Sequence, residues 1–247
     1  MNKLEREPER WGIIGGTGLD EFDALEIERV VAVDTPYGEV SAPLTFARLA
    51  GTPVVFMPRH GAAHHLPPHK INYRANIWAL AQCVEQAVAV AAVGGITPAC
   101  VPRTIVIPDQ IVDYTCGREH TFFDAADVQH VDFSEPYCSD IRAALVQAAA
   151  IAGVTVQSQG TYGATQGPRL ESGAEINRME RDGCDVVGMT GMPEAALARE
   201  AGLRYACCAL VVNEAAGRGP AVITMDDIMA HLHAGMIQVK ALLTALP

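Results

Sequence analysis

The sequence predicts an α/β fold: a single domain over residues 1–247, with a mixed, largely parallel central sheet flanked by helices. Short β-rich runs alternate with helical patterns in the later part of the chain, which is the order that builds a parallel sheet. A chain of 247 residues can bury a sizeable core. Its hydrophobic fraction of 49%, with 19% charged residues, is typical of a globular protein.

The expected elements follow one another without repeats or linkers. The strand-like runs are, in order, WGIIGG, ERVVAVD, LTFARLA, PVVFMP, VAVAAV, TIVIPDQIVDY, CDVVGM and RYACCALVV. The runs before residue 60 look antiparallel, so we expect a mixed sheet. Helical patterns cover Asn72–Gln86, Ser139–Ala152, Ser172–Asp182, Pro193–Ala201 and Thr224–Leu246. Ligands of such sheets bind beyond the carboxyl ends of the strands, where the Gly-rich loops of this chain fall.

Charge and cysteine content exclude several classes of function. A formal charge of −11 argues against a nucleic-acid partner, because a phosphate backbone needs a basic face. None of the seven cysteines has C-x-x-C spacing, which favours the cytoplasm and predicts neither a disulfide framework nor a zinc site. The start MNKLEREPER is charged and the apolar run Ala87–Ile96 is short. We therefore expect no signal peptide and no membrane segment.

The stretch WGIIGGTGLDEF places a glycine-rich loop directly after a strand. A dinucleotide site would explain the glycines together with Asp34 at the end of the next strand. However, the segment after the loop is short and acidic where a helix N-terminus should receive a pyrophosphate, and the chain has no Tyr-x-x-x-Lys. The other interpretation is a tight loop whose backbone N–H groups and Thr17 hydroxyl hold one compact anion. A plain turn also stays open.

A second informative stretch, MPRHGAAHHLPPHKINYRANIWAL, begins at Met57. It places Arg59 and His60 at the end of an apolar strand, and a guanidinium offers a planar fork for phosphate oxygens. Its histidines also suggest a metal site, but the loop has two prolines and no acidic residue, so the ligand geometry is unspecified. The histidines concerned are His60, His64, His65 and His69, with His231 and His233 further along. Solvated or core-capping histidines are the alternative.

Five motifs occur in the order typical of one family. They are Gly15-Gly16-Thr17-Gly18, Arg59-His60-Gly61, Asn72-Tyr73-Arg74-Ala75-Asn76-Ile77, Gly167-Pro168-Arg169 and Gly188-Met189-Thr190-Gly191-Met192-Pro193-Glu194. On these motifs the chain resembles the trimeric purine nucleoside phosphorylases, in particular their 5′-methylthioadenosine phosphorylase branch. The resemblance runs from about Gly12 to Met229, almost the whole chain.

The resemblance implies phosphorolysis, in which inorganic phosphate attacks C1′ of a purine nucleoside and releases the base. It assigns phosphate binding to Thr17, Arg59, His60, Ala92, Val93 and Thr190. It implies no metal and no organic cofactor, with phosphate as co-substrate, and self-association as a homotrimer or a hexamer. The family often carries hydroxyl side chains in the phosphate loop, whereas this chain reads AAVGGITPAC. Phosphate there would depend on backbone N–H groups.

The same resemblance assigns the substrate pocket and selects its base. The expected substrate residues are Met189, Leu170, Glu171, Asn213, Glu214, Ala215, Met225, Ile228, Met229 and His130, with Asn213, Glu171 and His60 as catalytic residues. Branches acting on 6-oxopurines have Glu and Asn at positions 171 and 213, as here, and adenine branches have Ser and Asp. A carboxylate only accepts hydrogen bonds, so Glu171 suits the N1–H of hypoxanthine. A surface glutamate and an asparagine cap are the alternatives.

The 5′ end of the pocket resembles the methylthioadenosine phosphorylase branch of the family, whereas the base end resembles the 6-oxopurine branches. Inosine phosphorylases usually place a histidine where this chain has Met225, and Met225, Ile228 and Met229 form one apolar helix face. Methionines suit a thioether, although such a stripe also suits a core. His130 matches a residue that family members supply across a subunit interface; a plain loop histidine is the alternative.

The resemblance, applied to both ends of the pocket, therefore predicts S-methyl-5′-thioinosine as the substrate, giving hypoxanthine and 5-methylthioribose 1-phosphate. The alternatives within the class are a methylthioadenosine phosphorylase and a general 6-oxopurine nucleoside phosphorylase. Outside the class stand an NAD-linked reductase, which the glycine loop would serve, and a nucleoside-binding module without catalysis.

Overall fold

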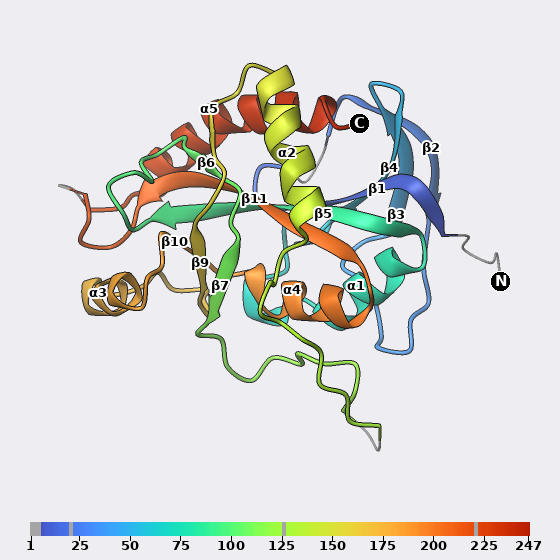
Figure 1. Cartoon of the computed structure of the whole chain (residues 1–247), viewed down its shortest axis with the longest axis horizontal. Coiled ribbons are helices and arrows are strands. Elements are labelled where there is room, and N and C mark those ends of the chain that lie inside the picture. Colours follow the sequence, from blue (N-terminus) through green and yellow to red (C-terminus); the bar gives the residue numbers. More distant parts are fainter. Residues whose placement is uncertain (1–5, 20–21, 125–126, 220–221) are drawn as a thin grey trace.

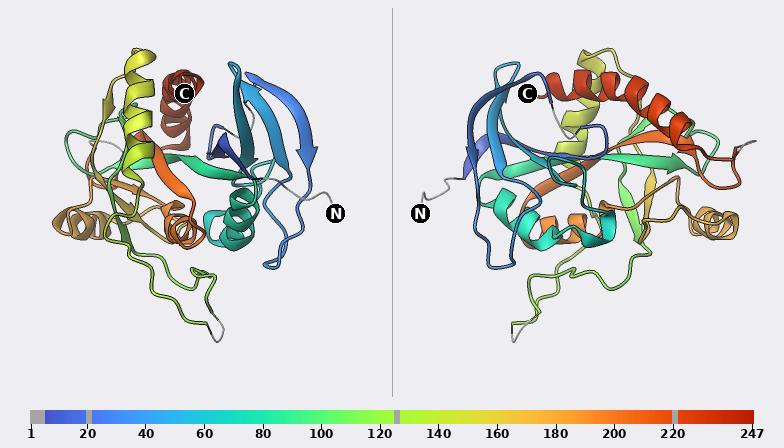
Figure 2. Two further views of the ribbon diagram at one scale, coloured as in Figure 1. Left: turned by 45° about the vertical axis from the view of Figure 1, so that its right-hand side comes forward. Right: turned by 180° about the vertical axis from the view of Figure 1, so that it is seen from behind.

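The computed structural model describes residues 6–19, 22–124, 127–219 and 222–247, and it confirms the predicted fold class (Figures 1 and 2). Its strands are β1 Glu7–Gly15, β2 Leu25–Val31, β3 Leu44–Leu49, β4 Thr52–Pro58, β5 Val84–Gly95, β6 Ile105–Val106, β7 Gln110–Asp113, β8 Val156–Gln157, β9 Thr161–Ala164, β10 Val186–Gly188 and β11 Arg204–Glu214. Its helices are α1 Tyr73–Ala81, α2 Ser139–Ile151, α3 Gly173–Arg181, α4 Gly191–Glu200 and α5 Met225–Thr244, with a short 3-10 turn at Pro68–Lys70.

The described strands form one mixed sheet that is organised around β5. Its order is β2-β3-β4-β1-β5-β10-β9-β7, while β11 pairs with β5 and with β6. Strand β5 pairs in parallel with β1 and β11 and antiparallel with β10. Of the runs before residue 60, which were expected to be antiparallel, β2, β3 and β4 pair antiparallel, whereas β1 pairs in parallel with β4. Strand β5 thus joins the strands on the β1 side of the sheet to those on the β10 side. Its residues after Val90 lie where these two sets of strands meet.

Helices cover the two faces of the sheet in pairs. Figure 2 shows α2 and α5 on one side of the sheet and α1 and α4 on the other. The side chains of β5 alternate between these layers, as expected for a strand buried on both faces. Ala87 and Ala89 pack in the core with α1 and α4, whereas Val88 and Val90 pack in the core with α2 and α5.

The helix ends follow local sequence signals. The Asn72 side chain accepts a hydrogen bond from the backbone N–H of Ala75 at the start of α1, and Thr224 caps α5 in the same way. Ser172 and Glu175 form a capping box at the start of α3.

The predicted helix Asn72–Gln86 was wrong at its end. Helix α1 stops at Ala81, because the chain from Val84 enters β5, a twelve-residue strand that starts earlier than the predicted VAVAAV run. The short strands β8 and β9 were not predicted, since each is only two to four residues long and β9 contains a glycine.

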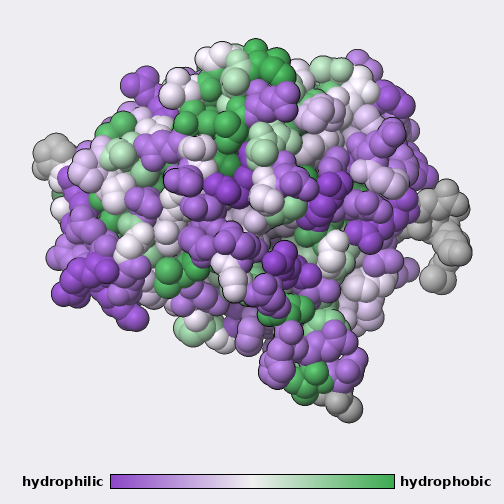
Figure 3. All heavy atoms as spheres, in the orientation of Figure 1, coloured by the Kyte–Doolittle hydropathy of each residue, from purple (hydrophilic) through white to green (hydrophobic). Residues whose placement is uncertain are grey.

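Residues 114–124 and 127–138 form no helix or strand, lie between β7 and α2 and project from the body of the molecule (Figure 1). They are the described part of the irregular segment 114–138. The visible face is mostly hydrophilic, with apolar side chains gathered over the end of α2, where Ile151 is exposed (Figure 3). Within the described ranges, no helix combines the length and the apolar character needed to cross a membrane.

Candidate active site

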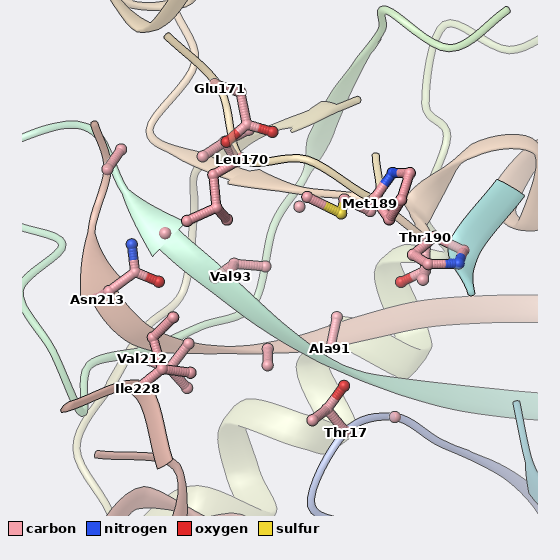
Figure 4. Close-up of a pocket in the computed structure, with 18 of the residues that line it drawn as sticks. Thr17, Ala91, Val93, Leu170, Glu171, Met189, Thr190, Val212, Asn213 and Ile228 are labelled. Carbon is pink, nitrogen blue, oxygen red and sulfur yellow. The ribbon is translucent and has the colours of Figure 1, made fainter. Parts of the chain in front are cut away.

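A cavity of about 310 Å³ lies where the loops after β1, β4, β9, β10 and β11 meet the carboxyl-terminal part of β5 (Figure 4). Most residues expected to contact substrate or phosphate line it: Thr17, Arg59, His60, Ala92, Val93, Leu170, Glu171, Met189, Thr190, Asn213, Ala215, Met225 and Ile228. Glu214, Met229 and His130 are not among its lining residues. Four of the five motifs therefore contribute residues to one cavity, whereas none of the residues of the Asn72-Tyr73-Arg74-Ala75-Asn76-Ile77 motif lines it.

Thr17 lies in the tight loop after β1, at the end of the cavity near Ala91 (Figure 4). Gly16 lets this loop lie against β5, because a Cβ atom there would overlap the carbonyl oxygen of Val90. Residues 16–19 and 22–24 lead into β2 without a helical residue. The helix N-terminus that a dinucleotide pyrophosphate requires is thus missing from the described part of this loop.

Arg59 follows β4 and is almost completely buried, with 1% of its surface exposed. Its Nε and Nη2 atoms donate to the two carboxylate oxygens of Glu194, at 2.6 and 2.8 Å. Its Nη1 donates to the carbonyl oxygen of Val90 at 2.9 Å, and the Tyr205 hydroxyl donates to Glu194 at 2.8 Å. These bonds use three of the five N–H groups of a guanidinium and leave two for a ligand in the cavity.

The Glu194 carboxylate stabilises the charged form of Arg59. Burial alone would lower the pKa of this guanidinium, but the ion pair with Glu194 outweighs burial and raises the pKa above its ordinary value. Arg59 therefore stays protonated, and its charge is largely balanced inside the protein. A phosphate entering the cavity meets directed N–H donors rather than an uncompensated cation.

His60 is held by its own loop. Its Nδ1 atom lies 2.8 Å from the carbonyl oxygen of Leu66, and because a carbonyl only accepts, Nδ1 carries the proton. In the neutral imidazole Nε2 is then an acceptor, and in the imidazolium it is a donor. The ring stacks on His64, with 4.5 Å between the centroids, and His64 also lines the cavity.

Thr190 and the strand β5 complete the end of the cavity around Arg59. Thr190 is 7% exposed, stands at the N-cap of α4 and makes no capping hydrogen bond with its side chain. Ala92 and Val93 line the cavity with side chains that have no polar atom, so a phosphate on this strand would contact the main chain. Met189 lies between Thr190 and Leu170 in Figure 4.

Glu171 and Asn213 lie at the opposite end, beside Leu170 (Figure 4). The buried Thr165 donates its hydroxyl to the Glu171 carboxylate at 2.6 Å, which fixes the orientation of that carboxylate. The side-chain amide of Asn213 donates to the carbonyl oxygen of Glu214 at 2.8 Å. Asn213 keeps a second N–H and its amide oxygen for a ligand, whereas Glu171 offers only acceptors.

The first turn of α5 borders the third side of the cavity. Met225 and Ile228 line it, although Met225 is 66% exposed, and Val212 lies beside Ile228 (Figure 4). Met229 is 37% exposed and was expected on the same face, but it is not a lining residue. His130 lies exposed on the irregular segment 114–138 and is not a lining residue.

The remaining histidines do not gather into a ligand set. Among the described residues, no group of three or more His, Cys, Asp or Glu side chains is arranged to hold a metal ion. His65 and His69 are not lining residues, and His231 and His233 lie on α5.

Sequence reasoning missed two residues that organise the site. Glu194 is the last residue of the motif that begins at Gly188, but nothing in the sequence indicated that it pairs with Arg59, 135 positions away. Thr165 lies six positions before Glu171 and belongs to no motif. A buried arginine needs a carboxylate partner, so one could have been sought for Arg59.

The profile of the Phosphorylase superfamily matches residues 10–246. A probable S-methyl-5′-thioinosine phosphorylase of Pseudomonas syringae is 55% identical over 236 residues, which cover 94% of this chain and 96% of the relative. A 6-oxopurine nucleoside phosphorylase of Pyrococcus furiosus is 45% identical, covering 96% and 92% of the two chains. The solved methylthioadenosine phosphorylase of Schistosoma mansoni in complex with adenine superposes with a TM-score of 0.91 and 32% identity, covering 96% of this chain and 90% of that one.

Proposed function

The chain belongs to the phosphorylase superfamily, and we propose that it catalyses the phosphorolysis of S-methyl-5′-thioinosine to hypoxanthine and 5-methylthioribose 1-phosphate. Four relatives that are 52–55% identical over 89–94% of this chain are named probable S-methyl-5′-thioinosine phosphorylases. The observation that carries the proposal is the pairing of Glu171 with Asn213 at one end of a cavity whose other end is bordered by Met225 and Ile228.

Hydrogen-bond polarity at the base end favours a 6-oxopurine. Hypoxanthine presents acceptors at O6 and N7 and a donor at N1–H, whereas adenine presents a donor at N6 and a bare acceptor at N1. The Glu171 carboxylate accepts from N1–H and repels the lone pair of adenine N1. The second N–H of Asn213 donates to O6 or N7. A buried mismatch of this kind costs about 1–3 kcal/mol for each unpaired group.

The reaction breaks the bond between C1′ and the purine nitrogen N9 and forms a bond between C1′ and a phosphate oxygen. The bonding electron pair leaves with the base, where Asn213 stabilises the charge by donating to O6 or N7. Arg59, Thr17 and Thr190 hold phosphate beneath C1′. His60 accepts a proton from a monoanionic phosphate, or donates to it when the imidazole is charged. Positioning and charge stabilisation are enough for an oxocarbenium-like transition state.

The 5′ end favours a methylthio group. Met225 and Ile228 provide a polarizable apolar surface and no hydrogen-bond partner for a 5′-hydroxyl. Burying a methylthio group gains on the order of 1–2 kcal/mol, and burying an unpartnered hydroxyl costs a comparable amount. The exposure of Met225 also keeps a second candidate open, a general 6-oxopurine nucleoside phosphorylase, because an exposed 5′ end would admit inosine.

The remaining features of the proposal concern assembly and conditions. We propose a cytoplasmic homotrimer in which the irregular segment 114–138 brings His130 to the site of a neighbouring copy. The segment projects from the body and leaves His130 exposed, which would let it reach another subunit (Figure 1). The enzyme would need no metal and no organic cofactor, with phosphate as its co-substrate.

Base release from S-methyl-5′-thioinosine, followed by chromatography with and without phosphate, tests the proposal. We expect hypoxanthine only when phosphate is present, and no effect of exhaustive chelation. Arg59→Lys should reduce kcat/KM for phosphate by about tenfold or more, because a single ammonium group cannot replace the planar set of N–H donors of the guanidinium. Lysine is preferred to alanine because alanine would leave Glu194 buried and unpaired. Base release without phosphate, or activity lost to EDTA and restored by zinc, would contradict the proposal.

A further inference from the structure

Arg118 lies outside the cavity, in the irregular segment 114–138, and its side chain is half-buried against the cavity wall. Every N–H of its guanidinium has an acceptor. The Nε atom donates to the side-chain oxygen of Gln166 at 3.0 Å. The Nη1 atom donates to the carbonyl oxygens of Met189 and Met192, at 2.8 and 2.5 Å. The Nη2 atom donates to the carbonyl oxygens of Thr165 and Gln166, at 3.2 and 2.8 Å.

These carbonyl groups belong to different elements. Thr165 and Gln166 follow β9, Met189 follows β10, and Met192 lies in the first turn of α4. Four backbone carbonyl groups from three elements thus share one cation. Among the described residues, no carboxylate is within ion-pair distance of Arg118. Its other neighbour is Tyr73 of α1, whose ring centroid lies 5.4 Å from the guanidinium carbon.

The segments that Arg118 joins carry opposite ends of the cavity. The Thr165 hydroxyl orients the Glu171 carboxylate at the base end. Met189 and Thr190, on the other bonded segment, line the sugar and phosphate part. We propose that Arg118 is a positioning residue: by bonding to the Thr165–Gln166 and Met189–Met192 backbones at once, it fixes the distance between the base-selecting carboxylate and the phosphate-binding residues. The proposal depends on the proposed function for its kinetic consequences.

A lysine cannot reproduce this arrangement. An ammonium group donates three hydrogen bonds from one point, whereas the guanidinium donates five in a planar fork that reaches both segments. Arg118→Lys therefore keeps the charge and most of the side-chain volume while removing the bridge. A matched control is Arg142→Lys in α2, because Arg142 is also half-buried and also donates to two backbone carbonyl groups, those of Pro108 and Ser158. Neither Arg118 nor Arg142 lines the cavity.

The kinetic test compares the two variants with the wild-type enzyme for kcat, for KM of both substrates, and for the preference for methylthioinosine over methylthioadenosine. Arg118→Lys should lower kcat/KM by about tenfold to a hundredfold, because a misplacement near 1 Å costs that much. It should also reduce the base preference several-fold. Arg142→Lys should change neither. If Arg118→Lys keeps the wild-type KM values and base preference, or loses activity only in proportion to its folded fraction, the proposal is overturned.

Hydrogen exchange gives a readout that does not depend on activity. In Arg118→Lys, amide exchange should accelerate in the peptides covering residues 165–172 and 189–192, and remain unchanged in those covering β1 and β4. Arg142→Lys should not accelerate exchange in these two segments. Unchanged exchange at both segments would overturn the positioning role even if the wild-type protein proves to be a phosphorylase. Accelerated exchange in a protein without phosphorolytic activity would instead support the positioning role of Arg118 and reject only the proposed function.

Discussion

Glu171 and Asn213 approach the base end from different elements, Glu171 from the loop after β9 and Asn213 from the end of β11. Each is held by a neighbour, Glu171 by the Thr165 hydroxyl and Asn213 by the Glu214 carbonyl. The pair therefore presents a defined set of acceptors and donors before any ligand binds. Such preorganisation is what allows two side chains to distinguish bases of the same size.

Exchanging these two residues should redirect the base preference. Asn213→Asp offers an acceptor to the adenine N6 amino group, and Glu171→Gln replaces repulsion at adenine N1 with an N–H donor. Glutamine also keeps an oxygen that accepts from Thr165. The double variant should shift kcat/KM from methylthioinosine toward methylthioadenosine by more than the two single changes combined, since both contact one rigid base. Additive or absent shifts in steady-state kinetics would show that the two residues do not read one base together.

At the scale of single residues, short motifs in the sequence located most of the cavity lining. Arg59, His60, Thr190 and Asn213 all reached the cavity as expected. The bonds between them were not predictable, because the Arg59–Glu194 pair joins positions 135 apart and depends on how β4 and α4 pack. The same holds for Arg118, because four of its acceptors are backbone carbonyl groups, which no sequence motif indicates.

The first turn of α5 is the element that sets the 5′ end of the cavity. Thr224 caps the helix, and the turn after it brings Met225 and Ile228 to the cavity while Met229 stays outside. The sequence predicted the helix and its apolar face. It could not predict which part of the face borders a cavity, because that depends on the angle at which α5 crosses the sheet.

A histidine at position 225 should admit a 5′-hydroxyl. Met225→His places an imidazole beside the 5′ carbon, so the kcat/KM ratio of methylthioinosine to inosine should fall by about tenfold, which corresponds to one hydrogen bond. A positive charge is unfavourable at a helix N-terminus, so the assay is best run at pH 8, where the imidazole is neutral. Met229→His is the matched control on the same helix. Equal effects of the two variants would contradict a 5′ role for Met225.

The whole molecule follows the predicted plan of a mixed, largely parallel sheet flanked by helices. The structure adds that the helices lie in two pairs, α2 with α5 and α1 with α4 (Figure 2). The alternation of helical and strand patterns was sufficient to predict this plan, because a helix buries one face and a central strand buries both, and each leaves its own hydrophobic pattern in the sequence. The sequence was insufficient for the sheet order around β5. That strand changes partner from β1 to β10 along its length, and such a change is set by long-range pairing. It is this change of partner that places the cavity beside Ala91 to Gly94.

All parts of the proposed site act together in choosing one nucleoside, so the central claim is tested most directly by competition. An equimolar mixture of methylthioinosine, methylthioadenosine and inosine is incubated with the wild-type protein and excess phosphate, and the loss of each nucleoside is followed by chromatography. The ratios of the depletion rates give the ratios of kcat/KM. We predict that methylthioinosine disappears first, about tenfold to a hundredfold faster than either competitor. Adenine released from methylthioadenosine as fast as hypoxanthine from methylthioinosine would contradict the account.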